Sequence, residues 1–167
     1  MPNPLDRPLA RSLILTAALL AAPWRPAAAA APGRSAVFDA NCSMCHQLAA
    51  AGVPGQFPRL AGRAGRIAAT AAGRRYLEHV VLYGMMGTIT VDGTQIVGGV
   101  MPSFASLSNQ DLADALDYLI SLDKSGKLHW KGAVIEPAQI ARVRAGKAWS
   151  PMQVHQLRAT ALPKAKP

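Results

Sequence analysis

The sequence predicts a mainly helical chain with one small β-hairpin and two short helices near its C-terminus. Apolar residues recur every three or four positions from Leu112 to Ile120, which is the pattern of an amphipathic helix. An Asp-Gly pair lies between two β-rich runs at residues 87–97, which is a strong hairpin signal. Two later segments each begin with a proline, a residue suited to the first position of a helix.

The N-terminal 30 residues have the layout of a secretory signal peptide. Arg7 and Arg11 precede a short apolar run, and small residues continue to Ala31. An uncleaved membrane anchor is the alternative, but this run is shorter than the roughly 20 residues that a spanning helix needs. We therefore expect residues 1–30 to be removed on export and the mature protein to reside in the periplasm.

The two cysteines of the chain, Cys42 and Cys45, are followed at once by His46. A disulfide is the default in an exported protein, but this run is the C-x-x-C-H motif for covalent attachment of haem c. Both thiols can add to haem vinyl groups from one helical turn, and the histidine brings an imidazole beneath the iron. A zinc site would need four ligands. A thioredoxin-like pair would need a preceding strand, whereas residues 36–41 are predicted to be helical.

Around this motif the chain resembles the single-haem class I c-type cytochromes, and within them a subgroup that carries a hairpin. The resemblance implies an all-α class I cytochrome c fold over residues 31–122, with the hairpin inserted before the loop that supplies a methionine ligand. Residues 123–167 then form a basic extension, with two short helices and a disordered tail. The family's Pro-x-Leu-x-Gly loop is matched at residues 58–62. It implies that the Pro58 carbonyl accepts a hydrogen bond from His46, and that Leu60 packs on the haem.

The resemblance also implies that Met101, between a pair of glycines and Pro102, is the second axial ligand. Met85 and Met86, at the predicted end of the middle helix, are the alternative ligands. His/Met ligation raises the reduction potential of the iron and fills both axial positions, so we expect an electron carrier and not an enzyme. The other candidates are expected at the surface or in the extension, without a role at the iron: His79, His129, His155 and Met152.

Two local features place the last helix of the predicted haem domain. Ser108 is a good N-cap residue, and Asp111 stands where a weak capping box would put it. Tyr118 lies where the family has an aromatic residue packing on the first helix, so Phe38 and Tyr118 are the predicted crossing. Asp111, Asp114 and Asp117 repeat at every third position along this helix, whereas residues 59–75 contain arginines and no acidic residue. This separation of charge predicts a dipolar domain.

The extension contains an internal repeat of fourteen residues. Pro-Ala-Gln-Ile at residues 137–140 and Arg144 are echoed by Pro-Met-Gln-Val at 151–154 and Arg158. Ser150 with Gln153 predicts a capping box, and Gly146 predicts the end of the first helix. Residues 124–127 are predicted to be a linker, and helices this short must pack on the haem domain or on another protein. Trp130 and Trp149 are the predicted anchors.

The excess positive charge lies in this extension. Residues 31–122 hold six basic and six acidic residues, whereas residues 123–167 hold nine basic residues against Asp123 and Glu136. An exported haem protein has little access to nucleic acid, so we expect residues 124–167 to contact a partner subunit or an anionic membrane surface.

The predicted function is therefore single-electron transfer by one covalent haem c, in a free shuttle or in the cytochrome subunit of a periplasmic dehydrogenase or oxidase. The expected partners are a dehydrogenase donor and a terminal oxidase or another cytochrome as acceptor. A haem enzyme or gas sensor with an open iron site is the alternative function.

Overall fold

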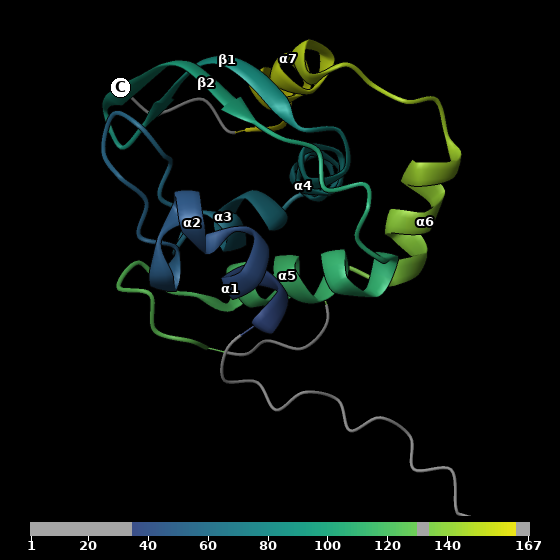
Figure 1. The fold of residues 1–167 in the computed structure, drawn as a ribbon, viewed down its shortest axis with the longest axis horizontal. Helices are drawn as coiled ribbons and strands as arrows, with labels where there is room; N and C mark the ends of the chain where they lie inside the picture. Colours follow the sequence, from purple (N-terminus) through teal and green to yellow (C-terminus); the bar gives the residue numbers. More distant parts are fainter. Residues whose placement is uncertain (1–34, 130–133, 163–167) are drawn as a thin grey trace, which may run out of the picture. The chain divides into compact units, whose positions relative to one another are not determined.

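The computed structural model describes residues 35–129 and 134–162 (Figure 1). The predicted signal peptide, Trp130 and the tail from residue 163 lie outside these ranges. The described part is mainly helical with one antiparallel hairpin, as predicted. No helix within it is both long and apolar enough to span a membrane. The elements in chain order are α1 Ala36–Asn41, α2 Ser43–His46, a 3-10 turn Leu48–Ala50, α3 Ala64–Ala68, α4 Ala71–Tyr83, β1 Met85–Val91, β2 Thr94–Met101, α5 Asn109–Ser121, α6 Pro137–Ala145 and α7 Pro151–Ala161.

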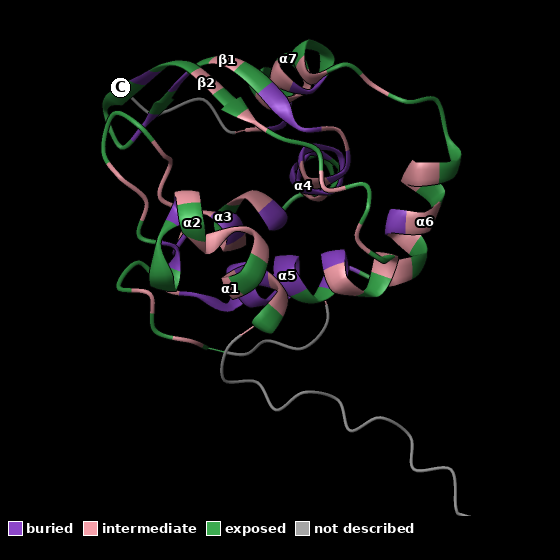
Figure 2. Ribbon diagram, in the orientation of Figure 1, coloured by how far each residue is buried: buried purple, intermediate pink, exposed green. Residues whose placement is uncertain are grey.

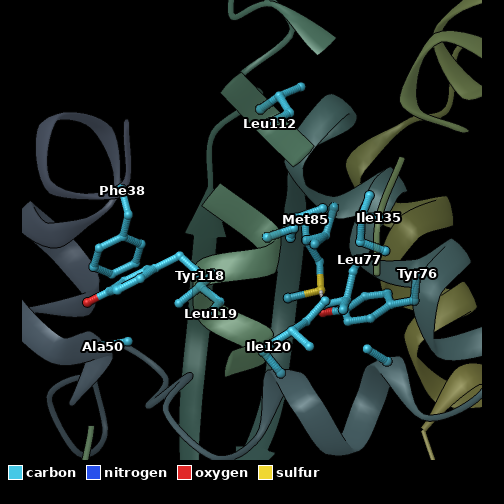
Figure 3. Close-up of a cluster of buried hydrophobic side chains, with 14 of the residues drawn as sticks. Phe38, Ala50, Tyr76, Leu77, Met85, Leu112, Tyr118, Leu119, Ile120 and Ile135 are labelled. Atoms are coloured by element: carbon cyan, nitrogen blue, oxygen red, sulfur yellow. Dashed lines mark hydrogen bonds between the residues drawn. The ribbon is translucent and has the colours of Figure 1, made fainter. Parts of the chain in front are cut away.

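Helices α1 and α5 begin at side-chain caps and cross at two aromatic rings. The Ser35 hydroxyl accepts the Phe38 amide at 3.1 Å. At the start of α5, the Ser108 hydroxyl accepts the Asp111 amide, and the Asp111 carboxylate accepts the Ser108 amide, so the capping box is complete. The rings of Phe38 and Tyr118 pack with centroids 5.3 Å apart (Figure 3). The predicted crossing is therefore confirmed.

The hairpin is longer than predicted and includes Met101. Helix α4 ends at Tyr83, its C-cap is Gly84 (φ 73°, ψ −174°), and β1 begins at Met85. Met85 and Met86, expected at the end of the middle helix, are therefore the first two residues of a strand. Gly98 and Gly99 lie within β2, and Met101 is the last residue of that strand, instead of following a flexible pair of glycines. The antiparallel register places Met85 directly opposite Met101.

The C-terminal helices pack on the rest of the described chain. In Figure 1, α7 lies beside the hairpin, and it contacts β1 and α4, whereas α6 contacts α5 and α4. The fourth residue of each repeat copy, Ile140 in α6 and Val154 in α7, has no exposed surface. Figure 2 shows that buried residues concentrate on α4 and α5, where these helices dock. The predicted start of each helix at a proline, the end of the first helix at Gly146 and the Ser150 capping box are confirmed.

Two side chains predicted at the surface are buried because segments of the extension cover them. Asp117 is 4% exposed, and its carboxylate accepts the amides of Val134 and Ile135 at 3.0 and 2.9 Å. His79 is 5% exposed, and its ring meets the edge of Trp149 at 4.7 Å. Asp117 therefore does not belong to an acidic surface stripe. One of the three acidic residues of the predicted dipole lies away from the surface.

The predicted linker at residues 124–127 is an ordered turn. The Asp123 carboxylate accepts the amides of Ser125 and Lys127 at 2.8 and 3.0 Å, and it also pairs with His129 at 2.9 Å. The Ser125 hydroxyl also donates to this carboxylate, at 2.7 Å. These hydrogen bonds lower the pKa of Asp123, and the bond from the Ser125 hydroxyl has the largest effect. A carboxylate that caps a turn in this way stabilises a fixed path for the chain, so the extension leaves α5 in a defined direction.

Candidate functional site

A cavity of about 300 Å³ is lined by residues of α2, α4, the hairpin and α7. Its wall is mainly apolar, and its volume lies at the lower end of the range for cofactor pockets, about 300 to 1,000 Å³. All six predicted site residues line it: Cys42, Cys45, His46, Pro58, Leu60 and Met101.

His46 is the last residue of α2, and one of its ring nitrogens is held in place by the chain. Nδ1 lies 2.9 Å from the Pro58 carbonyl oxygen, which can only accept a hydrogen bond. Nδ1 therefore carries the proton, and the lone pair of Nε2 is available to a metal. Burial lowers the pKa of His46, while the bond to Pro58 raises it. The neutral imidazole that results is the form that binds iron.

The two thiols and the imidazole come from one turn of backbone. Cys42 is the C-cap of α1, where its amide donates to the Phe38 carbonyl at 2.8 Å. The His46 amide in turn donates to the Cys42 carbonyl at 2.9 Å. Cys42 and Cys45 are free thiols. Burial, together with the charge of Cys45, raises the pKa of Cys42 to about 11. Within the described ranges, no three His, Cys, Asp or Glu side chains are grouped to hold a metal ion. The chemistry of this turn fits a haem group, which takes two thiols and one imidazole.

Two methionines line the cavity from opposite strands of the hairpin. Met85 is 7% exposed, and the Tyr76 hydroxyl donates to its sulfur at 3.6 Å (Figure 3). Met101 is half-buried, and among the described residues no donor reaches its sulfur at hydrogen-bond distance. Met86 is 40% exposed and does not line the cavity. The Met101 sulfur therefore has its lone pairs available, whereas the Met85 sulfur is already engaged.

The three histidines outside the motif do not line the cavity. His79 is buried against Trp149. His129 pairs with Asp123 near the exit of α5, and His155 on α7 lies 2.9 Å from the Thr88 carbonyl through Nε2. Each ring thus has a partner elsewhere in the chain.

The cavity wall also includes Arg63, Tyr76 and Arg158, which the sequence analysis did not assign to the site. Arg63 belongs to the basic run, and Arg158 to the second repeat copy, so the sequence places both in other contexts. The sequence shows only that Arg158 occupies the same position in the second repeat copy as Arg144 does in the first. This repeated position does not indicate that either arginine lines a pocket.

Part of the basic run is neutralised by the tip of the hairpin. Arg59 and Arg63 lie 2.8 and 3.5 Å from the carboxylate of Asp92. Burial alone would raise the pKa of Asp92, but the hydrogen bond and charge of Arg59, with Arg63 and Arg66, lower it below its ordinary value. The sequence places these charges about thirty residues apart, and folding brings them together beside the cavity.

Comparison with known proteins gives a family match over the same part of the chain. A family model described as cytochrome c matches residues 30–123. A protein named cytochrome c-552 from one strain of Thermus thermophilus is 43% identical over 91 residues, which cover 54% of this chain and 61% of the relative. A second cytochrome c-552 from Thermus thermophilus is 45% identical over 80 residues, which cover 48% and 60%. The chain spans about three fifths of the length of these curated relatives.

Proposed function

Because the chain belongs to the cytochrome c family, we propose that it is a single-electron carrier that binds one haem c through Cys42 and Cys45. His46 and Met101 are the proposed axial ligands. The observation that carries this proposal is the cavity wall, where one helical turn presents both thiols and an imidazole whose Nδ1 is held by Pro58. The bound haem supplies the one-electron chemistry of its iron.

The residues of the chain set the conditions for that chemistry. Pro58 orients the imidazole and increases its basicity by accepting the Nδ1 proton in a hydrogen bond. Leu60 and other apolar residues line the cavity and keep water from it. The Met101 thioether, a neutral and soft ligand, favours the reduced state, so the potential should be high. If His46 and Met101 both hold the iron, no position on it would remain for a substrate or a gas.

We assign the export signal to residues 1–30 and the periplasm as the location, on the charge and apolar pattern of that segment. The proposed partners are a dehydrogenase that donates electrons and an oxidase or second cytochrome that accepts them. Contact with a partner subunit or an anionic membrane surface is assigned to the basic side chains that are exposed in the described part of the extension, which are Lys124, Lys127, Arg142 and Lys147.

The ligand assignment is tested by replacing each methionine of the hairpin in turn. The wild-type ferric protein should show the weak red-edge absorbance band of iron–sulfur ligation, and a denatured digest should retain haem bound to the cysteines. Met101→Ala should remove that band and allow the ferrous protein to bind carbon monoxide rapidly. Met85→Ala, the matched control from the opposite strand, should keep the band.

The opposite pattern would reassign the ligand to Met85. A wild-type protein that is high-spin and binds carbon monoxide at once would overturn the electron-carrier proposal in favour of a haem enzyme or gas sensor. Partner contact is tested separately by changing Lys124, Lys127 and Lys147 to Glu. The rate of electron transfer with the purified partner should fall, and its dependence on salt should weaken.

A further inference from the structure

Two arginines lie in the wall of a cavity that is otherwise mainly apolar. Arg63 follows the Pro-x-Leu-x-Gly loop, and its side chain is 17% exposed. Arg158 is on α7, in the part of the chain beyond the family match. Both side chains are partly buried, and a guanidinium group taken even partly out of water is usually compensated by an anion. The two positive charges therefore need an anion beside them.

Contacts within the chain hold the Arg158 side chain at the cavity. Its guanidinium donates to the Thr90 carbonyl on β1 at 3.2 Å. Arg158 and Tyr76, a buried residue of α4, both line the cavity. The bond to a neutral carbonyl oxygen orients the planar fork but leaves its charge uncompensated.

The positive charge is only partly compensated by the protein. Asp92 pairs with Arg63 at 3.5 Å, but Asp92 is shared with Arg59. Among the described residues, no carboxylate lies at ion-pair distance from Arg158. Burial lowers the pKa of Arg63; against the pull of Asp92, the charge of Arg158 lowers it further, so the two guanidinium groups repel each other. An anion between them would remove this repulsion.

We infer that Arg63 and Arg158 bind the propionate carboxylates of the haem, so that helix α7 of the extension is part of the cofactor site. This inference rests on the proposed function, since it assigns the two carboxylates that every haem c carries. Guanidinium and carboxylate groups match in a two-bond geometry, and such charge-assisted pairs are the strong hydrogen bonds of proteins. Cys42 and Cys45 would hold the vinyl edge of the ring, and the two arginines would hold the propionate edge.

The assignment has a measurable consequence for the reduction potential. A positive charge near the haem favours ferrous over ferric iron, because the ferrous state carries one positive charge less. Arg158→Gln should therefore lower the midpoint potential of the haem-loaded protein. It should also shift the propionate bending bands in the resonance Raman spectrum, which respond directly to hydrogen bonds at these carboxylates.

A matched control separates this local effect from a change in net charge. Lys147→Gln removes one positive charge from an exposed position between α6 and α7, away from the cavity. It should leave the propionate bands unchanged and the potential close to that of the wild type. Arg158→Lys keeps the charge but loses the fork, so it should shift the bands while changing the potential less than Arg158→Gln does.

Identical propionate bands and potentials in Arg158→Gln and Lys147→Gln would overturn the inference while leaving covalent haem in place. If Arg158→Gln fails to mature, the Raman bands of Arg158→Lys decide the question, since unchanged bands there would refute it. Absence of covalent haem in the wild-type protein would instead overturn the proposed function.

Discussion

The structure makes Ile140 part of the hydrophobic core, so its truncation should destabilise the whole protein. Ile140 on α6 has no exposed surface, although it lies beyond the family match. Ile140→Ala removes three side-chain carbons, which at about 0.8 kcal/mol for each buried carbon are worth about 2.4 kcal/mol. The residual cavity adds to this, so we expect the free energy of unfolding to fall by about 3 kcal/mol, within the range for such truncations.

The assay is guanidinium unfolding of the haem-loaded protein, followed by two probes. Haem absorbance reports on the residues that bind the cofactor, and tryptophan fluorescence reports on the extension, since Trp130 and Trp149 are the tryptophans of the chain after residue 30. Both probes should move together to lower denaturant concentration, as in one cooperative transition.

Met152→Ala is the control, because this residue lies in the first turn of α7 with 48% of its surface exposed. Its effect should stay within about 0.5 kcal/mol, as for other surface substitutions. The reasoning would be refuted if Ile140→Ala shifted the fluorescence transition and left the haem transition in place. The extension would then be a separate unit that merely touches the haem domain.

Three further predictions concern single contacts. Gly84→Ala should weaken the iron–sulfur band and lower the free energy of unfolding by about 1 to 3 kcal/mol or more. Gly84 has a conformation almost restricted to glycine, and an added Cβ would lie 2.5 Å from the Met101 carbonyl oxygen. Gly93→Ala, at the open hairpin tip, should keep the band. Asp92→Asn should cost about 0.2 to 1 kcal/mol at neutral pH. The pKa of Asp92 is lower in the folded than in the unfolded protein, so the stabilisation by this carboxylate is fully present above its unfolded-state pKa and is lost as the pH falls through its folded-state pKa. Acid unfolding of the wild type and of Asp92→Asn should therefore show the difference in stability disappear in strong acid. Asp117→Ala should lower the free energy of unfolding, measured by denaturant titration, by about 1 to 3 kcal/mol for each amide left without an acceptor, while Asp114→Ala on the exposed face should change it little.

The features that the sequence predicted well are those determined within a few residues. The spacing of Cys42, Cys45 and His46 defines one turn, and Ser108 with Asp111 forms a cap across one turn of helix. Such patterns act through neighbouring backbone groups, so they do not depend on the tertiary contacts around them. Pro137 and Pro151 also act locally, and each is the first residue of the helix that it predicts.

The features that the sequence missed depend on residues far along the chain. His79 reads as a surface residue of a helix until Trp149, seventy positions later, covers it. The role of Met101 as the end of a strand depends on its pairing with Met85, and strand register is determined by cross-strand packing that periodicity alone does not show. Arg158 could be assigned to the cavity only after α7 had been placed against the hairpin.

The repeat in the extension explains how one short pattern can support two different surfaces. In both copies the fourth residue is buried and the eighth is an arginine that donates to backbone carbonyls. Arg144 binds the Asn109 side chain and the Leu107 carbonyl at the start of α5, whereas Arg158 binds the Thr90 carbonyl on β1. The second copy therefore fastens the hairpin that ends at the proposed ligand Met101. Because Arg158 holds β1, and β1 pairs with the strand that ends at Met101, the stability of the iron–sulfur bond should depend on α7. This helix lies outside the family match, so the family alone does not predict that dependence.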